Sequence, residues 1–212
     1  AWAVVDCAEY HRQPFFVIEN VPEFMEWSLY PSFCDAMQRL GYALSPHVVD
    51  AADHGVPQNR ERLFLVGSRS KHPIKLDLPR REHVPVARIL KWDDHPWSPI
   101  MKPGRSPKTL RRVSNGRVSY GRRFVMPYYG SGSGLTGRSL DRPLGTVTTK
   151  DRWALVDGDR MRMLAIPEYL AAMGFRADYR LPARKDTALQ MIGNAVAPIV
   201  ACDVIESLKN AA

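Results

Sequence analysis

The sequence predicts an α/β fold on three observations. Short apolar runs typical of buried strands, at residues 15–18 and 63–66, alternate with stretches of helical periodicity. Strand and helix succeed one another through residues 1–71, which is the signature of an α/β layer with a mainly parallel sheet. The chain has 212 residues and 45% hydrophobic content, enough for one buried core and a small second domain.

Local signals place the elements of this first region. Pro31 suits the first position of a helix, and Gly41 suits its end. The expected order is a helix through residues 1–11, a strand from residue 15, a helix at 31–40, and strands at 42–51 and 62–69.

Polar side chains follow the first strand and precede the last. Glu19 and Asn20 stand at a strand's carboxyl end, where ligands bind in open α/β sheets. Alternation along an extended chain puts Gln58, Arg60 and Arg62 on one face. Two guanidiniums on one face suit an oxyanion or a phosphate, although a solvated strand edge has the same pattern.

The middle of the chain is strongly basic. The chain's net charge is +8, and residues 102–123 hold eight basic residues and no acid. Glycines within this segment predict loop and short-strand material rather than helix. We expect the segment to contact phosphates and bases, the alternative being a solvated basic loop. Its basic residues are Lys102, Arg105, Lys108, Arg111, Arg112, Arg117, Arg122 and Arg123.

A glycine- and serine-rich stretch follows at residues 128–134. Its two tyrosines, Tyr128 and Tyr129, suit either stacking on bases or closing the core of a small domain.

Regular structure returns near the end of the chain. Residues 167–173 predict a short helix closed by Gly174, and Asp186 suits the cap of a turn that leads to Gln190. Asn194 is expected to start a final helix, with Gly193 permitting a sharp turn before it. One buried stripe is expected on that helix, formed by Val196, Ile199, Val200, Val204 and Leu208.

Taken in order, these segments resemble the DNA cytosine-5 methyltransferase family. The resemblance is carried by a Glu-Asn-Val motif at Glu19, a Gln-x-Arg-x-Arg motif at Gln58 and a Gln-x-x-Gly-Asn-x-Val motif at 190–196. Residues 142–149 and 162–175 resemble the segments that precede the last motif, so the resemblance covers the whole chain. One departure is Ala165, where the family usually has threonine.

The resemblance implies the fold and its division. It implies the C-terminal part of a Rossmann-like S-adenosylmethionine-dependent methyltransferase sheet, mixed in strand direction, with a small irregular target recognition domain. Residues 1–71 would belong to the catalytic α/β domain, 72–141 to the target recognition region, and 142–212 to a return to the catalytic domain that ends in a cofactor-side helix.

The resemblance also implies roles for individual residues. Glu19 resembles the family's carboxylic acid that acts on cytosine ring nitrogen 3, and Arg62 suits stabilisation of charge on the exocyclic oxygen. Arg60 would assist Arg62 through contacts with a phosphate or with the pocket. Asn20 would hold the geometry of the loop that follows the strand. Gln58 joins the basic segment as a DNA-binding residue. The residues implied to line the S-adenosylmethionine pocket are Asn194, Ala195 and Val196.

Two of the family's motifs are absent from this sequence, namely the Phe-x-Gly-x-Gly cofactor loop and the Pro-Cys nucleophile. Cys7 follows Asp6 rather than proline and lies in a helical pattern, so we do not expect it to be the nucleophile. The chain therefore reads as the C-terminal half of a larger enzyme or one subunit of a split enzyme. We expect it to be inactive without its N-terminal half.

Composition narrows the setting. Cys7, Cys34 and Cys202 are dispersed, which favours reduced thiols over disulfides or structural zinc, and no metal site is expected. Reduced thiols indicate the cytoplasm, and a DNA partner would place the protein near the nucleoid. No apolar stretch approaches the roughly 18 residues that a membrane span needs. The predicted partner is double-stranded DNA, and the predicted reaction is methylation of carbon 5 of a flipped cytosine in bacterial or phage DNA modification. Two alternatives are methylation of RNA by the same chemistry and a non-catalytic binding or specificity subunit.

Overall fold

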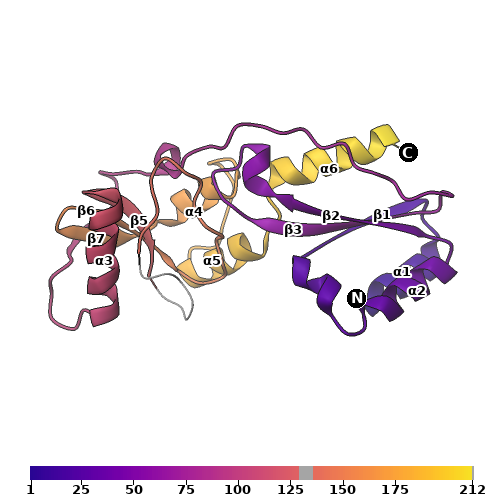
Figure 1. Ribbon diagram of the computed structural model, residues 1–212, viewed down its shortest axis with the longest axis horizontal. Helices are drawn as coiled ribbons and strands as arrows, with labels where there is room; N and C mark the ends of the chain where they lie inside the picture. The colour runs from indigo at the N-terminus through magenta and orange to yellow at the C-terminus, as the bar shows by residue number, and fades with distance from the viewer. Residues whose placement is uncertain (129–135, 212) are drawn as a thin grey trace. The chain divides into compact units, whose positions relative to one another are not determined.

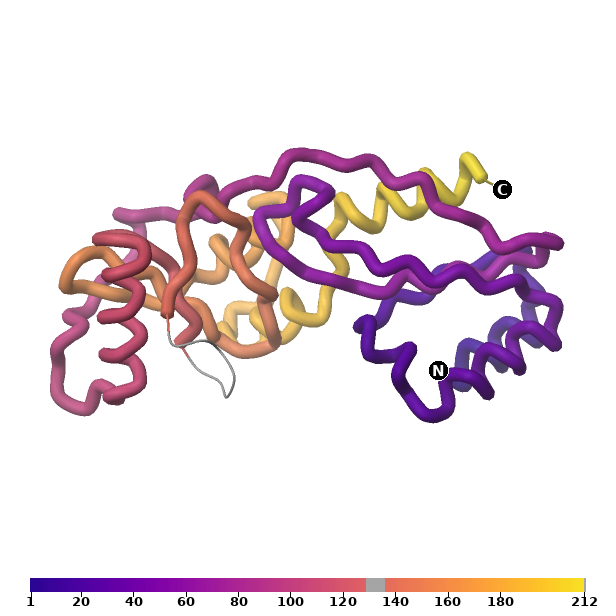
Figure 2. The backbone as a smooth tube through the Cα atoms, viewed as in Figure 1, coloured from indigo at the N-terminus to yellow at the C-terminus, as the bar shows by residue number. Residues whose placement is uncertain are grey.

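The computed structural model describes residues 1–128 and 136–211, which form two compact units. Unit 1 comprises Ala1–Ala51, Arg60–Arg80 and Val200–Ala212, and unit 2 comprises Ala52–Asn59 and Arg81–Ile199. The course of the backbone through each unit can be followed in Figure 2. These units do not coincide with the boundaries predicted at residues 71 and 141.

Unit 1 contains the predicted strands and helices of the first region. In order they are α1 (Trp2–His11), β1 (Phe15–Asn20), the 3₁₀ helix η1 (Pro22–Glu26), α2 (Tyr30–Arg39), β2 (Ala43–Asp50) and β3 (Glu61–Ser68), followed by most of α6 (Pro198–Ala211). The predicted elements are confirmed to within a few residues at their ends.

The expectation of a mainly parallel sheet is wrong for this chain. The strand order is β1-β3-β2, and both pairs are antiparallel. The connection through α2 leaves β1 and β2 pointing the same way. A short connection, too short for a parallel crossover, then inserts β3 between them in the opposite direction. The expected antiparallel pairing is therefore present, while the parallel neighbours are not.

Helices cover both sides of this sheet, with α1 and α2 on one side and α6 on the other (Figure 1). The core under α1 and α2 is formed by Ala8, Phe33, Met37, Tyr42, Leu63 and Leu65. Gly67 of β3 lies under the ring of Phe16, so close that an added Cβ would stand 2.1 Å from ring carbons. The packing thus fixes β1 against β3 and holds the strand ends where Glu19 and Arg62 stand.

Unit 2 is built on a four-stranded antiparallel sheet with the order β4-β7-β6-β5. Its elements are η2 (Ala51–His54, whose first residue belongs to unit 1), η3 (Val86–Ile89), β4 (Ser98–Pro99), α3 (Pro107–Tyr120), β5 (Arg123–Pro127), β6 (Trp153–Asp157), β7 (Arg160–Met163), α4 (Ile166–Ala172) and α5 (Lys185–Asn194). The short helix at 167–173 is confirmed, and Gly174 after it has a positive φ of 74°.

The basic segment is not loop and short strand, because residues 107–120 form the helix α3. Pro107 stands in its first turn, a favoured place for proline. Gly116 is buried in this helix, and a Cβ there would stand 2.3 Å from the ring of Phe124. The glycine therefore permits close packing of α3 on β5 and does not mark a loop.

The end of the chain also differs from its prediction. Asn194 is the last residue of α5, and α6 begins at Pro198, so Asn194 does not start the final helix. Gly193 lies inside α5, where a Cβ would stand 2.4 Å from the backbone of Thr148. The glycine thus serves helix-to-backbone contact rather than a sharp turn. The buried stripe on α6 is confirmed by Val200, Val204 and Leu208.

One stretch of the described residues, Lys185–Ala211, passes a length and hydropathy test for a membrane span, contrary to the sequence expectation. Its mean hydropathy reaches 1.6. The structure breaks this stretch into α5 and α6, and the apolar stripe of α6 is buried in unit 1. Cores of water-soluble proteins contain helices with the same composition.

Candidate active site

Glu19 and Arg62 form an ion pair across neighbouring strands of unit 1. Arg62 Nε lies 3.1 Å from Glu19 Oε1, and the side chains are 18% and 25% exposed, respectively. The register explains the contact, because Glu19 is opposite Phe64 and Arg62 is two residues away on the same face. The two predicted motifs therefore deliver a carboxylate and a guanidinium to one point at the sheet's end.

Arg60 adds a third charge to this group. The residue is only 3% exposed, its backbone N–H donates to Asp50 Oδ1 at 2.8 Å, and its carbonyl accepts from Ala51. Burial, and to a lesser extent the positive charge of Arg62, lower the pKa of Arg60 to about 10, while the Glu19 carboxylate acts against both. Arg60 is thus electrostatically coupled to the Glu19–Arg62 pair.

Asn20 acts on the backbone beside this group. Its side-chain Oδ1 accepts a hydrogen bond from the N–H of Val21 at 2.8 Å. The bond shapes the chain as it leaves β1 and enters η1.

Gln58 lies in unit 2 and is fully buried. Its Nε2 donates to the carbonyl of Ala172 at 3.2 Å and to Met173 Sδ at 2.9 Å, and its Oε1 accepts from the N–H of Val147 at 2.6 Å. Within unit 2, the amide therefore joins the segment after η2 to the end of α4 and to the segment before β6. Direct DNA contact by this side chain would require these three hydrogen bonds to break.

The three residues of the closing motif lie at the end of α5 and in the break that follows it. Asn194 is exposed, Ala195 and Val196 are half-buried, and the Ala195 N–H donates to Ile192 at 3.2 Å. Close packing of Gly193 on the backbone of residues 148–149 holds this break in place. The break offers one carboxamide and adjoining backbone groups to a polar ligand.

Five of the eight predicted basic residues contact partners in unit 2, although three of them, Arg117, Arg122 and Arg123, are exposed. Arg112 is 6% exposed and donates to the carbonyl of Tyr128, and Arg105 donates to the Tyr128 hydroxyl at 2.8 Å. Arg117 pairs with Asp159 at 2.9 Å. Arg122 and Arg123 both pair with the buried carboxylate of Asp157.

The remaining three, Lys102, Lys108 and Arg111, are exposed. Lys108 and Arg111 are three residues apart and so lie on one face of α3. Tyr128 packs on the core under α3, which favours the core-closing interpretation for this ring. Tyr129 and the glycine-rich stretch lie outside the described residues.

Two features of unit 2 escaped the sequence interpretation. The first is a carboxylate, Asp157, which also binds Arg160 and so collects three arginines. The second is a pocket lined by Arg138 and Arg142, which lie beyond the basic segment. The prediction of DNA-binding residues was based on the density of basic residues at 102–123. These two sites depend instead on strand pairing, which that density does not reveal. Among the described residues, no group of His, Cys, Asp and Glu side chains could hold a metal ion.

Known proteins share sequence or fold with this chain. The model of the C-5 cytosine-specific DNA methylase family matches residues 1–96 and 102–210. Type II methyltransferase M.MthTI of Methanothermobacter thermautotrophicus is 34% identical over 82 residues, covering 37% of this chain and 25% of the relative. Type II methyltransferase M.MspI of Moraxella sp is 22% identical over 221 residues, covering 97% of this chain and 48% of the relative.

Among solved structures, a DNMT2 mutant from Spodoptera frugiperda superposes with a TM-score of 0.65 at 12% identity, covering 98% of this chain and 70% of that one. This likeness shows the methyltransferase fold. The chain spans about half the length, or less, of the two curated relatives described above. Because the family model matches nearly the whole chain, this protein belongs to the C-5 cytosine-specific DNA methylase family.

Proposed function

We propose that the chain is the C-terminal part of a DNA (cytosine-5-)-methyltransferase. The whole enzyme would transfer a methyl group from S-adenosylmethionine to carbon 5 of cytosine in duplex DNA, as part of bacterial or phage DNA modification in the cytoplasm. The observation that carries the proposal is the Glu19–Arg62 contact of 3.1 Å, which brings two family motifs together.

The chemistry of cytosine explains why such a pair is useful. Carbon 5 becomes nucleophilic only after a thiolate adds to carbon 6, and the added electron density spreads toward ring nitrogen 3 and the exocyclic oxygen. Both atoms are bonded to ring carbon 2, so they are adjacent on one edge of the base. A carboxyl group and a guanidinium in mutual contact match these adjacent positions.

Each side chain has a distinct part in this scheme. Glu19 would hydrogen-bond or protonate ring nitrogen 3, as a general acid does. Arg62 would stabilise negative charge on the exocyclic oxygen, and its pre-set position reduces the reorganisation needed during reaction. The buried Arg60 would add positive potential to the same pocket. The base must leave the duplex to reach these groups.

The break between α5 and α6 fits one side of a cofactor site. Asn194 is exposed and can hydrogen-bond polar groups, while the half-buried Ala195 and Val196 offer backbone and apolar contact. This donor set suits part of a nucleoside or amino-acid ligand such as S-adenosylmethionine, which would supply the methyl group. The three residues would hold and orient that ligand.

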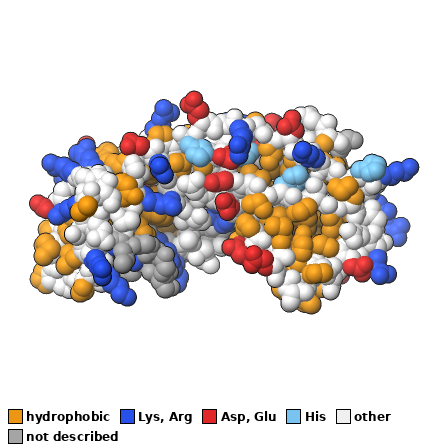
Figure 3. Space-filling view, in the orientation of Figure 1, with side chains coloured by type: hydrophobic (Ala, Val, Ile, Leu, Met, Phe, Trp, Pro, Cys, Tyr) orange, Lys and Arg blue, Asp and Glu red, His pale blue; other side chains and the backbone are white. Residues whose placement is uncertain are grey.

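A further polypeptide would complete unit 1. Among the described strands, β1 pairs only with β3, so its other edge is open. Its apolar residues Val17 and Ile18 are only half-buried, and Trp2, Val21 and Leu29 are 44%, 42% and 45% exposed. Figure 3 shows apolar side chains gathered on the surface of unit 1. An open edge beside apolar surface favours association, and we propose the N-terminal half of the enzyme as the partner.

Reconstitution tests this proposal. The chain is mixed with a separately produced N-terminal half that carries the Phe-x-Gly-x-Gly and Pro-Cys motifs, and transfer of radiolabelled methyl to duplex DNA is measured. We expect transfer from the mixture and none from either half alone. A partner whose Pro-Cys cysteine is changed to alanine serves as the control.

Two results would contradict the proposal. Transfer by the isolated chain would show that the nucleophile lies within these residues. A preference for tRNA over duplex DNA in competition would move the substrate to RNA.

A further inference from the structure

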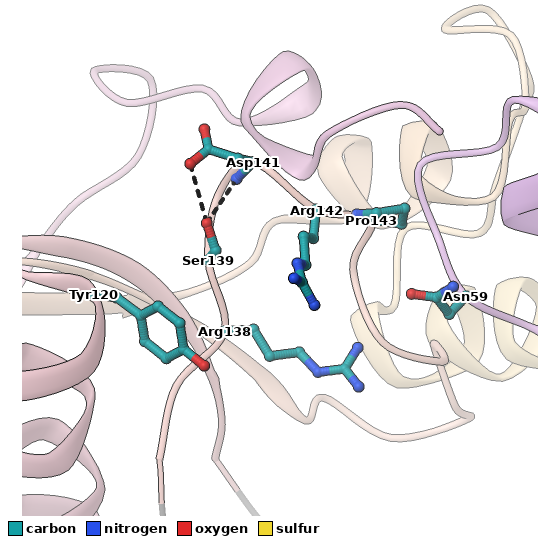
Figure 4. Close-up of a pocket in the computed structure, with 7 residues that line it drawn as sticks. All are labelled: Asn59, Tyr120, Arg138, Ser139, Asp141, Arg142 and Pro143. Atoms are coloured by element: carbon teal, nitrogen blue, oxygen red, sulfur yellow. Dashed lines mark hydrogen bonds between the residues drawn. The ribbon is translucent and has the colours of Figure 1, made fainter. Parts of the chain in front are cut away.

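Unit 2 contains a pocket of about 630 Å³ that the catalytic scheme does not use. It lies between the end of α3, the segment after residue 136 and the residues before β3. Its lining residues are Asn59, Tyr120, Arg138, Ser139, Asp141, Arg142 and Pro143 (Figure 4).

The pocket presents positive charge. Arg138 and Arg142 are both exposed, and Figure 4 shows their side chains directed into the space between Tyr120 and Asn59. Among the described residues, neither the Arg138 nor the Arg142 guanidinium forms an ion pair. The one acidic lining residue, Asp141, accepts a hydrogen bond from Ser139 Oγ at 3.1 Å, and its carboxylate points away from both arginines (Figure 4).

The backbone that carries these arginines is braced. The backbone of Arg138 exchanges two hydrogen bonds with Val125 of β5, at 2.7 and 3.2 Å, and the Arg142 carbonyl accepts from Val86 at 2.9 Å. The Arg138 guanidinium lies 5.8 Å from the ring of Trp153, a cation–π distance. Two guanidiniums are thus held beside one open space, where their mutual repulsion favours an anion between them.

We infer that this pocket binds a backbone phosphate of the DNA substrate through Arg138 and Arg142, an inference that rests on the proposed function. Guanidinium forks match the geometry of phosphate oxygens and keep their charge at any physiological pH. The pocket is larger than a lone phosphate group needs, so it suits a phosphate that is part of a chain. The Tyr120 ring and the Asn59 amide stand beside the sugar and flanking groups.

The pocket changes the expected DNA-binding surface. Five of the eight basic residues in the 102–123 segment have internal partners, whereas Arg138 and Arg142 face open space. Asn59 directly precedes Arg60 in sequence, so one lining residue of the pocket belongs to the motif that supplies the proposed catalytic arginines. A phosphate held here would fix the strand's register without reading its sequence.

The test measures the affinity of the 212-residue chain for a fluorescent duplex as a function of salt. The test variant, R138Q/R142Q, removes two charges from the pocket. The control variant, R176Q/R184Q, removes two charges from exposed arginines of unit 2, whose side chains are 87% and 79% exposed. Both variants lower the net charge from +8 to +6, so any difference between them is local.

We expect the slope of log affinity against log salt to fall by about 0.9 in R138Q/R142Q, the value for one phosphate contact, and to change by less than about 0.5 in the control. R138K/R142K keeps both charges and should retain the wild-type slope. If R138Q/R142Q does not fold, R142Q alone should lower the slope by part of this value. Circular dichroism verifies the fold of each variant.

Three outcomes would overturn the inference. Equal slopes in the test and control variants would overturn it alone and leave the proposed function standing. Saturable binding of inorganic phosphate at constant ionic strength, lost in R138Q/R142Q while the DNA slope is unchanged, would assign the pocket to a free anion. Absence of duplex binding both by the wild-type chain and by its mixture with the N-terminal half would overturn the proposed function together with this inference.

Discussion

Arg162 and Glu168 form a doubly hydrogen-bonded ion pair sealed inside unit 2. Both guanidinium Nη atoms donate to the carboxylate at 2.7 Å, and the side chains are 3% and 0% exposed. Glu168 also accepts from the backbone N–H groups of Lys91 and Ala165, both at 2.8 Å. The carboxylate therefore joins β7, the start of α4 and the segment after η3.

Glu168→Gln should destabilise the protein by about 3–5 kcal/mol, because it leaves the buried Arg162 charge without its counter-charge. Urea unfolding measures the loss. The control is Asp186→Asn, which breaks an exposed arginine pair and should leave the midpoint unchanged. Replacing both partners, as in R162M/E168L, should recover only part of the stability, because the backbone N–H groups of Lys91 and Ala165 lose their acceptor. A Glu168→Gln midpoint equal to wild type would show that the pair does not hold unit 2 together.

Stability should fall in acid because of two buried carboxylates. Burial alone would raise the pKa values of Asp157 and Glu168, but hydrogen bonds from arginines hold both below their ordinary values. Since the folded-state pKa is below the unfolded value of about 4, the contribution is complete above that pH and is lost as pH falls toward the folded-state pKa. Thermal unfolding between about pH 7 and pH 2 checks this.

The matched variant is Asp157→Asn, which should show a smaller loss of melting temperature between these pH values than wild type. It removes one of the two groups that bind extra protons on unfolding. An identical acid dependence in wild type and variant would contradict the assignment.

Gly193→Ala should destabilise the chain even though alanine is the better helix former. A helix interior normally gains about 1 kcal/mol from this change. Here the new Cβ would stand 2.4–2.6 Å from the backbone of Thr148 and Thr149, which overpacking penalises by about 1–3 kcal/mol. Met191→Ala, at an exposed position of α5, is the control and should change little. A stabilised Gly193→Ala protein would show that this contact is loose.

The neighbours Arg111 and Arg112 should respond differently to replacement by alanine. Arg111 is exposed on α3, so its loss should lower the salt slope of duplex binding by about 0.9. Arg112 lies on the buried face of α3, so its loss should lower stability and leave the slope nearly unchanged. Paired urea and salt titrations separate the two effects. The reverse pattern would place the DNA on the other side of α3.

The sequence was most informative where one local signal dominated. An apolar run predicted strand β1, and a proline and a glycine predicted the two ends of helix α2. Helical periodicity predicted the buried stripe of α6. The same signals failed where tertiary contact decided the outcome. Gly116 and Gly193 were interpreted as breaks, but both lie inside helices that need close approach to a neighbour.

The same distinction separates the parts of the candidate site. The order of motifs brought Glu19 and Arg62 to notice, and strand register then places them in contact. Charge density alone could not distinguish Arg111, which is exposed, from Arg112, which is buried, because helical facing decides it. The arginine pocket depends on pairing of Arg138 with Val125, a contact between distant stretches that no local pattern encodes.

The central claim is that Glu19 acts on the cytosine ring, and single-turnover methyl transfer by the reconstituted enzyme tests it most directly. Glu19→Gln keeps the shape and a hydrogen-bond donor but cannot give a proton to ring nitrogen 3. Turnover should fall by about a hundredfold to ten-thousandfold with duplex affinity nearly unchanged, while the exposed control Glu23→Gln keeps wild-type turnover. A turnover loss below about threefold, or a parallel loss of stability and DNA binding, would contradict the claim.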